Sequence, residues 1–105
     1  MASATLSYAA SSILLAVGNG YAYGFDIMDF TGLPSGTVYP ALRRLEESEY
    51  VASRWEKGNG AFREQRPARK YYSLTRLGEV ALETALRRYP LLEHIAPNLP
   101  KKPEA

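Results

Sequence analysis

The sequence predicts a mainly α-helical domain with a small β-hairpin, its elements in the order helix, helix, helix, strand, strand, helix. Apolar residues recur with the helical period in four segments. Two segments, 50–56 and 69–74, are rich in aromatic and β-branched residues that alternate with period two on either side of a glycine-containing loop. With 105 residues the chain fits one domain, which we place at 1–96, and we expect 97–105 to be a disordered tail.

The composition excludes several classes of protein. Hydrophobic residues make up 46% and charged residues 23%, which is typical of a globular protein rather than a disordered one. Without cysteine the chain forms no disulfide or thiolate zinc site, and we expect it in the cytoplasm. The single histidine, His94, is expected at the surface, so we predict no enzyme, no metal site and no cofactor. The apolar run 13–17 is too short for a membrane span.

The first two helices are predicted at residues 5–17 and 23–30. The run Gly-Asn-Gly at 18–20 ends the first, because these residues tolerate the left-handed conformation of a C-cap. A tight turn at 31–35 follows the second. The apolar positions of the two helices are Leu6, Ala9, Ala10, Ile13 and Val17, then Phe25, Ile27, Met28 and Phe30.

The third helix is predicted at 36–48, with Ser35 as its N-cap because a serine hydroxyl can accept a first-turn amide. Pro40 removes one helical hydrogen bond, so we expect either a bend or a start nearer Thr37. The predicted core face holds Val38, Ala41, Leu42 and Leu45. The opposite face holds Gly36, Pro40, Arg43 and Glu47, flanked by Thr37 and Tyr39.

The hairpin segment carries the basic charge of the chain. Residues 54–70 have a net charge of +4, whereas residues 26–49 have −3. The connecting loop, 57–68, is long and basic, and loops of that length are usually functional. Tyr71 and Tyr72 are consecutive in a strand, so one should face outward and the other the core.

The fourth helix is predicted to begin after a Thr75 cap, to run through Tyr89 and to stop at Pro90. One apolar face comprises Leu77, Val80 and Ala81. A second face, extended past the helix, comprises Leu82, Ala85, Leu86, Tyr89 and Leu92. A helix that is apolar on two faces needs two partners. We expect the first face to pack on the core and the second on the same helix of another subunit, making this a C-terminal dimerisation helix.

This order of elements describes a winged helix-turn-helix, in which the third helix enters the major groove and the hairpin wing reaches the backbone. Three segments of the chain resemble the signature segments of PadR-type transcriptional regulators. They are Tyr-Gly-Phe-Asp-Ile at 23–27, Gly-Thr-Val-Tyr-Pro-Ala-Leu-Arg-Arg-Leu-Glu at 36–46, and Arg-Lys-Tyr-Tyr-Ser-Leu-Thr at 69–75 with Gly78 following. The resemblance covers about residues 6–89 and implies a dimeric repressor, often of detoxification, phenolic acid or efflux genes. Many proteins of this type respond to a small aromatic ligand.

The chain departs from the family pattern at the end of the third helix, where Glu49 stands in place of the usual glycine. Either a left-handed residue there costs its non-glycine side chain about 1 kcal/mol, or the helix ends differently here. The only tryptophan, Trp55, lies in the wing, so no tryptophan of the fourth helix can stack on a ligand across a dimer.

The DNA-contacting residues are expected on the third helix and the wing. Amides and hydroxyls at the start of the helix can hold a phosphate, Arg43 is the best candidate for a guanine edge, and the wing cations would anchor the backbone. The full set is Ser35, Gly36, Thr37, Tyr39, Arg43, Arg44, Arg63, Arg66, Arg69, Lys70 and Tyr71. These features predict a homodimeric repressor that binds double-stranded DNA at an inverted-repeat operator. A winged-helix module that binds protein and no DNA remains the alternative.

Overall fold

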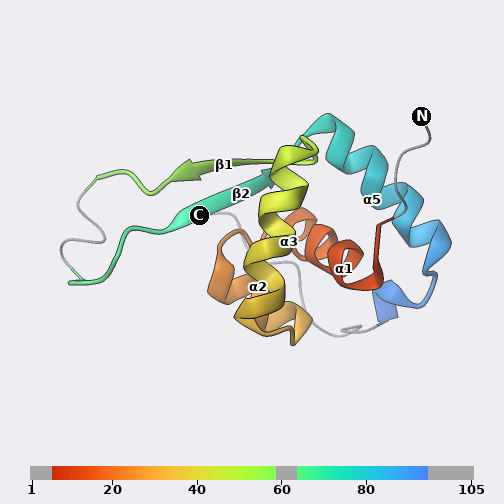
Figure 1. The fold of residues 1–105 in the computed structure, drawn as a ribbon, viewed down its shortest axis with the longest axis horizontal. Helices are drawn as coiled ribbons and strands as arrows, with labels where there is room; N and C mark the ends of the chain where they lie inside the picture. Colours follow the sequence, from red (N-terminus) through yellow and green to blue (C-terminus); the bar gives the residue numbers. More distant parts are fainter. Residues whose placement is uncertain (1–5, 59–63, 95–105) are drawn as a thin grey trace.

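The computed structural model describes residues 6–58 and 64–94 and confirms the predicted order of elements. Its α-helices are α1 (Tyr8–Gly18), α2 (Gly24–Thr31), α3 (Ser35–Glu47) and α5 (Arg76–Arg88), followed by a 3-10 turn at Leu92–His94. Strands β1 (Val51–Trp55) and β2 (Lys70–Leu74) form the antiparallel hairpin. The helices gather around α1 and the hairpin extends away from them as a wing (Figure 1).

The core is centred on α1, which packs against α2, α3, α5 and β2. Ile13 and Leu14 are fully buried there, together with Ile27 of α2. The predicted core face of α3 is confirmed, because all of its members are buried: Val38, Ala41, Leu42 and Leu45. The hydrophobic effect of this single cluster therefore holds the three-helix unit together.

The first two helices begin and end differently from the prediction. The Ser7 hydroxyl accepts the Ala10 amide at 3.0 Å, so α1 begins at Tyr8 rather than at residue 5. After α1 the left-handed residue is Gly20, with φ 91°, whereas Asn19 has φ −95°. In α2 the predicted apolar residue Phe25 is 68% exposed and does not belong to the core.

Helix α3 begins one residue earlier than predicted. The Pro34 carbonyl accepts the amides of Thr37 and Val38, both at 3.0 Å, so Ser35 is the first helical residue and its side chain does not cap the helix. The expected N-cap role of Ser35 is therefore wrong. Pro40 lies inside the helix, so the start did not move toward Thr37.

Of the two alternatives for the end of α3, the structure has the left-handed one, because Glu49 has φ 64°. The Tyr50 amide donates to the Leu45 carbonyl at 2.9 Å and the Glu49 amide to the Glu46 carbonyl at 3.0 Å. These two bonds are the Schellman pattern that usually has glycine at the position occupied by Glu49. The helix thus stops with a carboxylate-bearing side chain in a conformation that favours glycine.

In the wing, Val51 pairs with Leu74 and Trp55 with Lys70. This register puts Tyr72 in the core, at 9% exposure, and Tyr71 on the other face of the hairpin. The prediction that one of the two tyrosines faces the core and the other faces outward is therefore confirmed. The side chains of Ser53, Trp55, Lys70 and Tyr72 share the face that looks toward α3, since the Ser53 hydroxyl donates to the Glu46 carboxylate at 2.5 Å. Arg54 lies with Tyr71 on the far face.

Helix α5 begins where the prediction placed it. The Thr75 hydroxyl accepts the Gly78 amide at 3.0 Å and donates to the Glu49 carbonyl at 2.5 Å. A Cβ atom at Gly78 would overlap the Tyr50 carbonyl oxygen, so glycine is required for this close approach. The helix ends at Arg88, before Pro90.

The two apolar faces of α5 are only partly placed as predicted, because Ala81 packs on the core as expected but members of the face assigned to a second subunit do so too. Ala85 and Leu92 are buried inside the subunit and Leu82 packs on the core, while Leu77 and Val80 are each 56% exposed. Hydrophobic periodicity finds both faces but carries no information on which one meets α1. Leu77 and Val80, which the prediction assigned to the core, therefore lie on the outer surface of the subunit.

The remaining members of the predicted dimer face are also engaged within the chain. The Tyr89 ring meets Tyr8 edge to face with centroids 5.3 Å apart, and its hydroxyl donates to the Leu6 carbonyl at 3.3 Å. Leu86 is half-buried. Tyr89 therefore fastens α5 to the start of α1.

Candidate nucleic-acid interface

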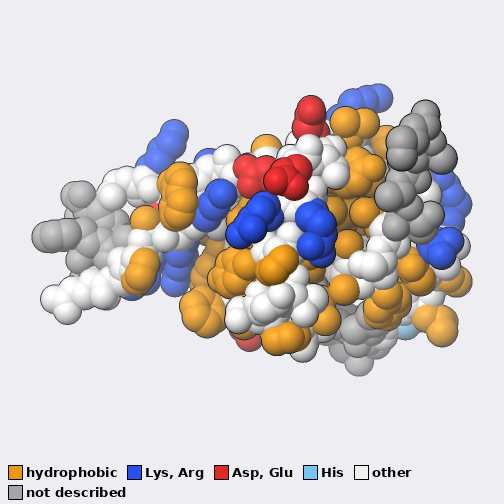
Figure 2. Space-filling view, viewed as in Figure 1, with side chains coloured by type: hydrophobic (Ala, Val, Ile, Leu, Met, Phe, Trp, Pro, Cys, Tyr) orange, Lys and Arg blue, Asp and Glu red, His pale blue; other side chains and the backbone are white. Residues whose placement is uncertain are grey.

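The exposed face of α3 carries most of the predicted DNA-contacting residues. Ser35 and Gly36 are exposed at its start, where the first amides of a helix have no acceptor within it. Arg43 and Arg44 are exposed further along, and neither forms an ion pair within the described part of the chain. In Figure 2 basic side chains lie at the centre of the view, over α3, with acidic side chains directly above them.

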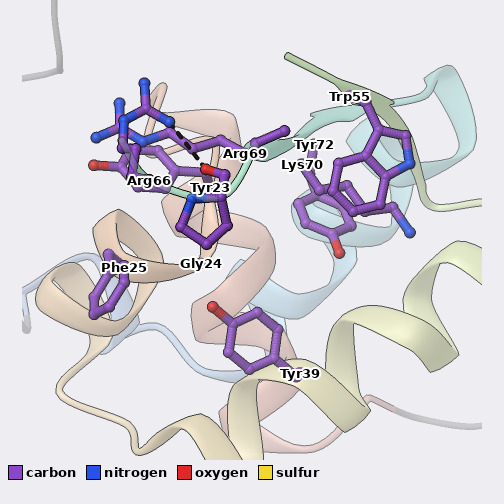
Figure 3. Close-up of a pocket in the computed structure, with 11 residues that line it drawn as sticks. Tyr23, Gly24, Phe25, Tyr39, Trp55, Arg66, Arg69, Lys70 and Tyr72 are labelled. Atoms are coloured by element: carbon purple, nitrogen blue, oxygen red, sulfur yellow. Dashed lines mark hydrogen bonds between the residues drawn. The ribbon is translucent and has the colours of Figure 1, made fainter. Parts of the chain in front are cut away.

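Tyr39 bends back from this face toward the start of α2. Its hydroxyl points at Gly24, as Figure 3 shows, and a Cβ atom there would overlap the phenol. The side chain is 45% exposed. Tyr39 therefore belongs to both helices of the helix-turn-helix unit, with one edge packed and the other open to a ligand.

A groove of about 490 Å³ separates α3 from the base of the wing. Aromatic rings line much of it, and three cationic side chains reach it (Figure 3). The rings are Tyr23, Phe25, Tyr39, Trp55 and Tyr72, and the cations are Arg66, Arg69 and Lys70. Aromatic and cationic side chains together suit a phosphate and sugar chain or a planar anion.

Lys70 ties the wing to α3. Its ammonium lies 3.5 Å from the Glu46 carboxylate, and 5.8 Å from the ring centroids of both Trp55 and Tyr72. Because Ser53 donates to the same carboxylate, Glu46 holds both strands against the recognition helix. Burial raises the pKa of Tyr72 beneath this cluster, with the charge of Glu46 contributing further.

Arg69 and Tyr71 lie at the junction of the wing and α2. The Arg69 guanidinium is 4.3 Å from the Tyr23 ring centroid, a cation–π distance. Tyr71 meets the other side of this junction, with its ring 5.7 Å from that of Tyr23 and 5.2 Å from the Arg54 guanidinium. Tyr71 is therefore not brought together with Tyr39 and Lys70, which line the groove.

Arg66 is committed to carboxylates of its own wing. Its guanidinium donates to both oxygens of Glu56, at 2.7 and 2.8 Å, and to Glu64 at 2.6 Å. This bonding raises the pKa of Arg66, and the same bond, with that from the Arg69 amide, lowers the pKa of Glu56 to about 2. The predicted anchor of the DNA backbone is thus compensated within the wing.

Two residues of the interface were missed by sequence reasoning. Trp55 is 60% exposed at the groove. The sequence feature that could have identified it is a single tryptophan on the same strand face as a lysine of the wing. Glu56 has no comparable signal, since its partner lies ten residues away across the loop. Arg63, predicted to contact DNA, lies outside the described residues, as does the predicted tail at 97–105.

Residues 6–58 and 64–94 contain neither a metal-ligating cluster nor a membrane-spanning helix. No group of three or more histidine, aspartate or glutamate side chains could hold a metal ion there. In that same portion of the chain no helix has both the length and the apolarity that crossing a membrane requires.

Comparison with known proteins decides the family. Residues 13–84 match the model of the transcriptional regulator PadR-like family. The chain belongs to the PadR-like family. This PadR-like protein is accordingly a DNA-binding transcriptional regulator, and the groove between α3 and the wing lies on its predicted DNA face. No curated protein matches the chain significantly.

Solved structures agree with this assignment. A PadR family transcription regulator from Clostridium difficile superposes with a TM-score of 0.68 and 24% identity, covering 87% of this chain and 96% of that one. A PadR-like transcription factor from Bacteroides fragilis gives 0.64 and 28%, covering 84% and 85%. Bordetella bronchiseptica BpsR, whose DNA binding is regulated by 6-hydroxynicotinic acid, gives 0.67 and 19%, covering 94% and 71%. The fold of this PadR-like protein is therefore shared by a protein, BpsR, whose DNA binding is regulated by a small molecule.

Proposed function

We propose that this chain is a dimeric repressor that binds an inverted-repeat operator. The observation that carries the proposal is the continuity of the exposed α3 face with the cationic, aromatic groove of the wing. A duplex that receives α3 in its major groove would bring the adjacent sugar–phosphate backbone to that groove. Arg43 would then read a base edge, and Lys70 and Arg69 would position the backbone.

Dimerisation is supported by the outer face of α5, where Leu77 and Val80 are exposed next to each other on the helix. A second copy would cover them through an isologous contact. In such a dimer two recognition helices meet major grooves about one turn apart. The half-sites should then be roughly 10 base pairs apart, centre to centre.

An effector of the small aromatic class is supported by the same groove. Trp55 and Tyr39 offer partly exposed rings, and Arg69 offers a charge for an anionic substituent. A ligand held there would occupy the space that the DNA backbone needs, so ligand and operator would exclude each other. Titration of a protein–operator complex with 6-hydroxynicotinic acid and other aromatic carboxylates tests this, and release of DNA is the expected result.

The decisive experiment is selection of DNA fragments by the purified protein, followed by sequencing. We expect the enriched fragments to contain an inverted repeat with half-sites roughly 10 base pairs apart, centre to centre. Binding to the enriched site should weaken linearly in a plot of log affinity against log salt, because phosphate contacts release counterions. A protein that retains no DNA at low salt would defeat the proposal and favour the protein-binding alternative.

A further inference from the structure

The base of the wing is closed by one carboxylate. Glu56 follows β1 directly, and its two oxygens receive the two terminal nitrogens of Arg66 at 2.7 and 2.8 Å. One of these oxygens also accepts the Arg69 amide at 3.1 Å, while the Glu56 amide donates to the Arg69 carbonyl at 2.7 Å. Glu56 thus joins the outgoing arm of the wing to two points of the returning arm.

This arrangement is unusual for a surface ion pair. The side chains of Arg66 and Glu56 are only 20% and 14% exposed, and the contact is bidentate. Fork-to-fork contacts of this kind are directional and resist screening better than exposed single contacts. The pKa of Glu56, lowered to about 2, agrees with a carboxylate held in its ionised form.

The position of the pair matters because the residues next to it line the groove. The Arg69 amide donates to the Glu56 carboxylate, and the Arg69 guanidinium stacks on Tyr23. Lys70 follows as the first residue of β2. The pair therefore fixes the chain just before the two cations that face the predicted DNA backbone. A negative charge at the centre of a basic wing would otherwise oppose DNA binding.

We propose that Glu56 is a positioning residue for DNA binding, which latches the two arms of the wing through Arg66 and the Arg69 amide so that Arg69 and Lys70 stay in the interface. The inference rests on the proposed function. It assigns Arg66 to the wing's own architecture rather than to a phosphate. Its distinctive consequence is the direction of the change in affinity: removing this negative charge should weaken DNA binding.

The test compares Glu56→Ala with Glu64→Ala. Both remove one carboxylate that bonds Arg66, and both change the net charge equally, but Glu64 is the more exposed and does not bond the Arg69 amide. On an operator-sized duplex we expect the Kd of Glu56→Ala to rise about tenfold, the scale of a lost charge-assisted pair. Glu64→Ala should bind as tightly as the wild type or more tightly.

A third variant separates geometry from charge. Arg66→Lys keeps the charge but replaces the planar fork by a single ammonium, so we expect several-fold weaker binding. Hydrogen exchange of the Arg69 amide in DNA-free protein should accelerate about tenfold in Glu56→Ala and stay unchanged in Glu64→Ala. Melting curves of all three variants report whether the core is intact.

The outcomes separate this inference from the proposed function. A wild-type chain that binds no DNA defeats both. A wild type that binds DNA, with Glu56→Ala binding as tightly or more tightly, defeats the latch alone. Unchanged exchange at the Arg69 amide, or Arg66→Lys equal to the wild type in affinity, would also overturn it.

Discussion

The Tyr39 phenol of α3 lies directly against the α-carbon of Gly24 at the start of α2. The contact joins the two helices of the helix-turn-helix unit at the edge of the groove. Glycine at position 24 is therefore a packing requirement, since the backbone there is helical and any residue could adopt it.

Gly24→Ala should displace the Tyr39 ring and destabilise the protein by about 1–3 kcal/mol, the usual cost of overpacking. In a Tyr39→Ala background the same change should cost much less, so a double-mutant cycle of unfolding free energies would show strong coupling. Gly36→Ala is the control, because open space surrounds that position and alanine should gain up to about 1 kcal/mol in the helix. Additive effects at positions 24 and 39 would contradict the contact.

Arg43→Ala should reduce affinity for a matched operator by about 1–3 kcal/mol and leave non-specific binding nearly unchanged, because a base-edge contact is lost. Arg54→Ala removes the same charge from the hairpin face that points away from α3. This substitution should reduce the affinity for matched and mismatched DNA equally, and only slightly. Binding isotherms on both duplexes decide. Equal losses on both for Arg43→Ala would place that arginine on the backbone.

Glu49→Gly should raise the free energy of unfolding by up to about 1 kcal/mol, since φ at this position is 64° and glycine adopts that conformation without a Cβ penalty. Glu49→Ala keeps the Cβ atom and should melt close to the wild type. Thermal melts of the pair separate backbone strain from the charge of the side chain. A midpoint for Glu49→Gly at or below that of Glu49→Ala would refute the strain.

Val80→Glu should convert a dimer into a monomer by placing an unpaired charge in the seam on α5. The side chain is exposed in the subunit, so the monomer should remain folded. Ala52→Glu, an exposed position on β1, is the control and should stay dimeric. Sedimentation or light scattering at micromolar concentration measures the mass. A wild-type chain that is already monomeric there would exclude a dimer through α5.

The carboxyl group of Glu56 should titrate near its pKa of about 2 in the folded protein, well below the ordinary 4.5. A depressed folded-state pKa contributes stability that is present above 4.5 and is lost as the pH falls from there through 2. The latch should therefore be constant at neutral pH. NMR titration of the Glu56 carboxyl carbon checks the value, and Arg66→Ala should move its midpoint toward 4.5. A wild-type midpoint near 4.5 would be inconsistent with the bidentate pair.

Local patterns predicted much of this fold. The apolar period of α3 identified Val38 and Leu42, and the alternation in β2 required one of Tyr71 and Tyr72 to be buried. Each of these depends on residues within one element or its cap.

Relationships between elements could not be predicted in the same way. The wheel of α5 has apolar residues on two sides, and only the placement of α1 decides that Ala85 is buried and Val80 exposed. Charge counting treated Arg66 as an available cation, although Glu56 meets it across the wing loop. Phe25 is apolar and helical yet exposed, and it lines the groove rather than the core.

The junction between α3 and α5 has a mechanical consequence. The Thr75 amide donates to the Tyr50 carbonyl at 3.1 Å, the Thr75 hydroxyl to the Glu49 carbonyl, and Gly78 lies against that same Tyr50 carbonyl. The end of the recognition helix and the start of α5 therefore turn together as one rigid elbow. In a dimer joined along α5, the crossing angle of the two α5 helices would set the distance between the two α3 helices. A small rotation at that interface would therefore change the spacing of half-sites that the dimer can bind.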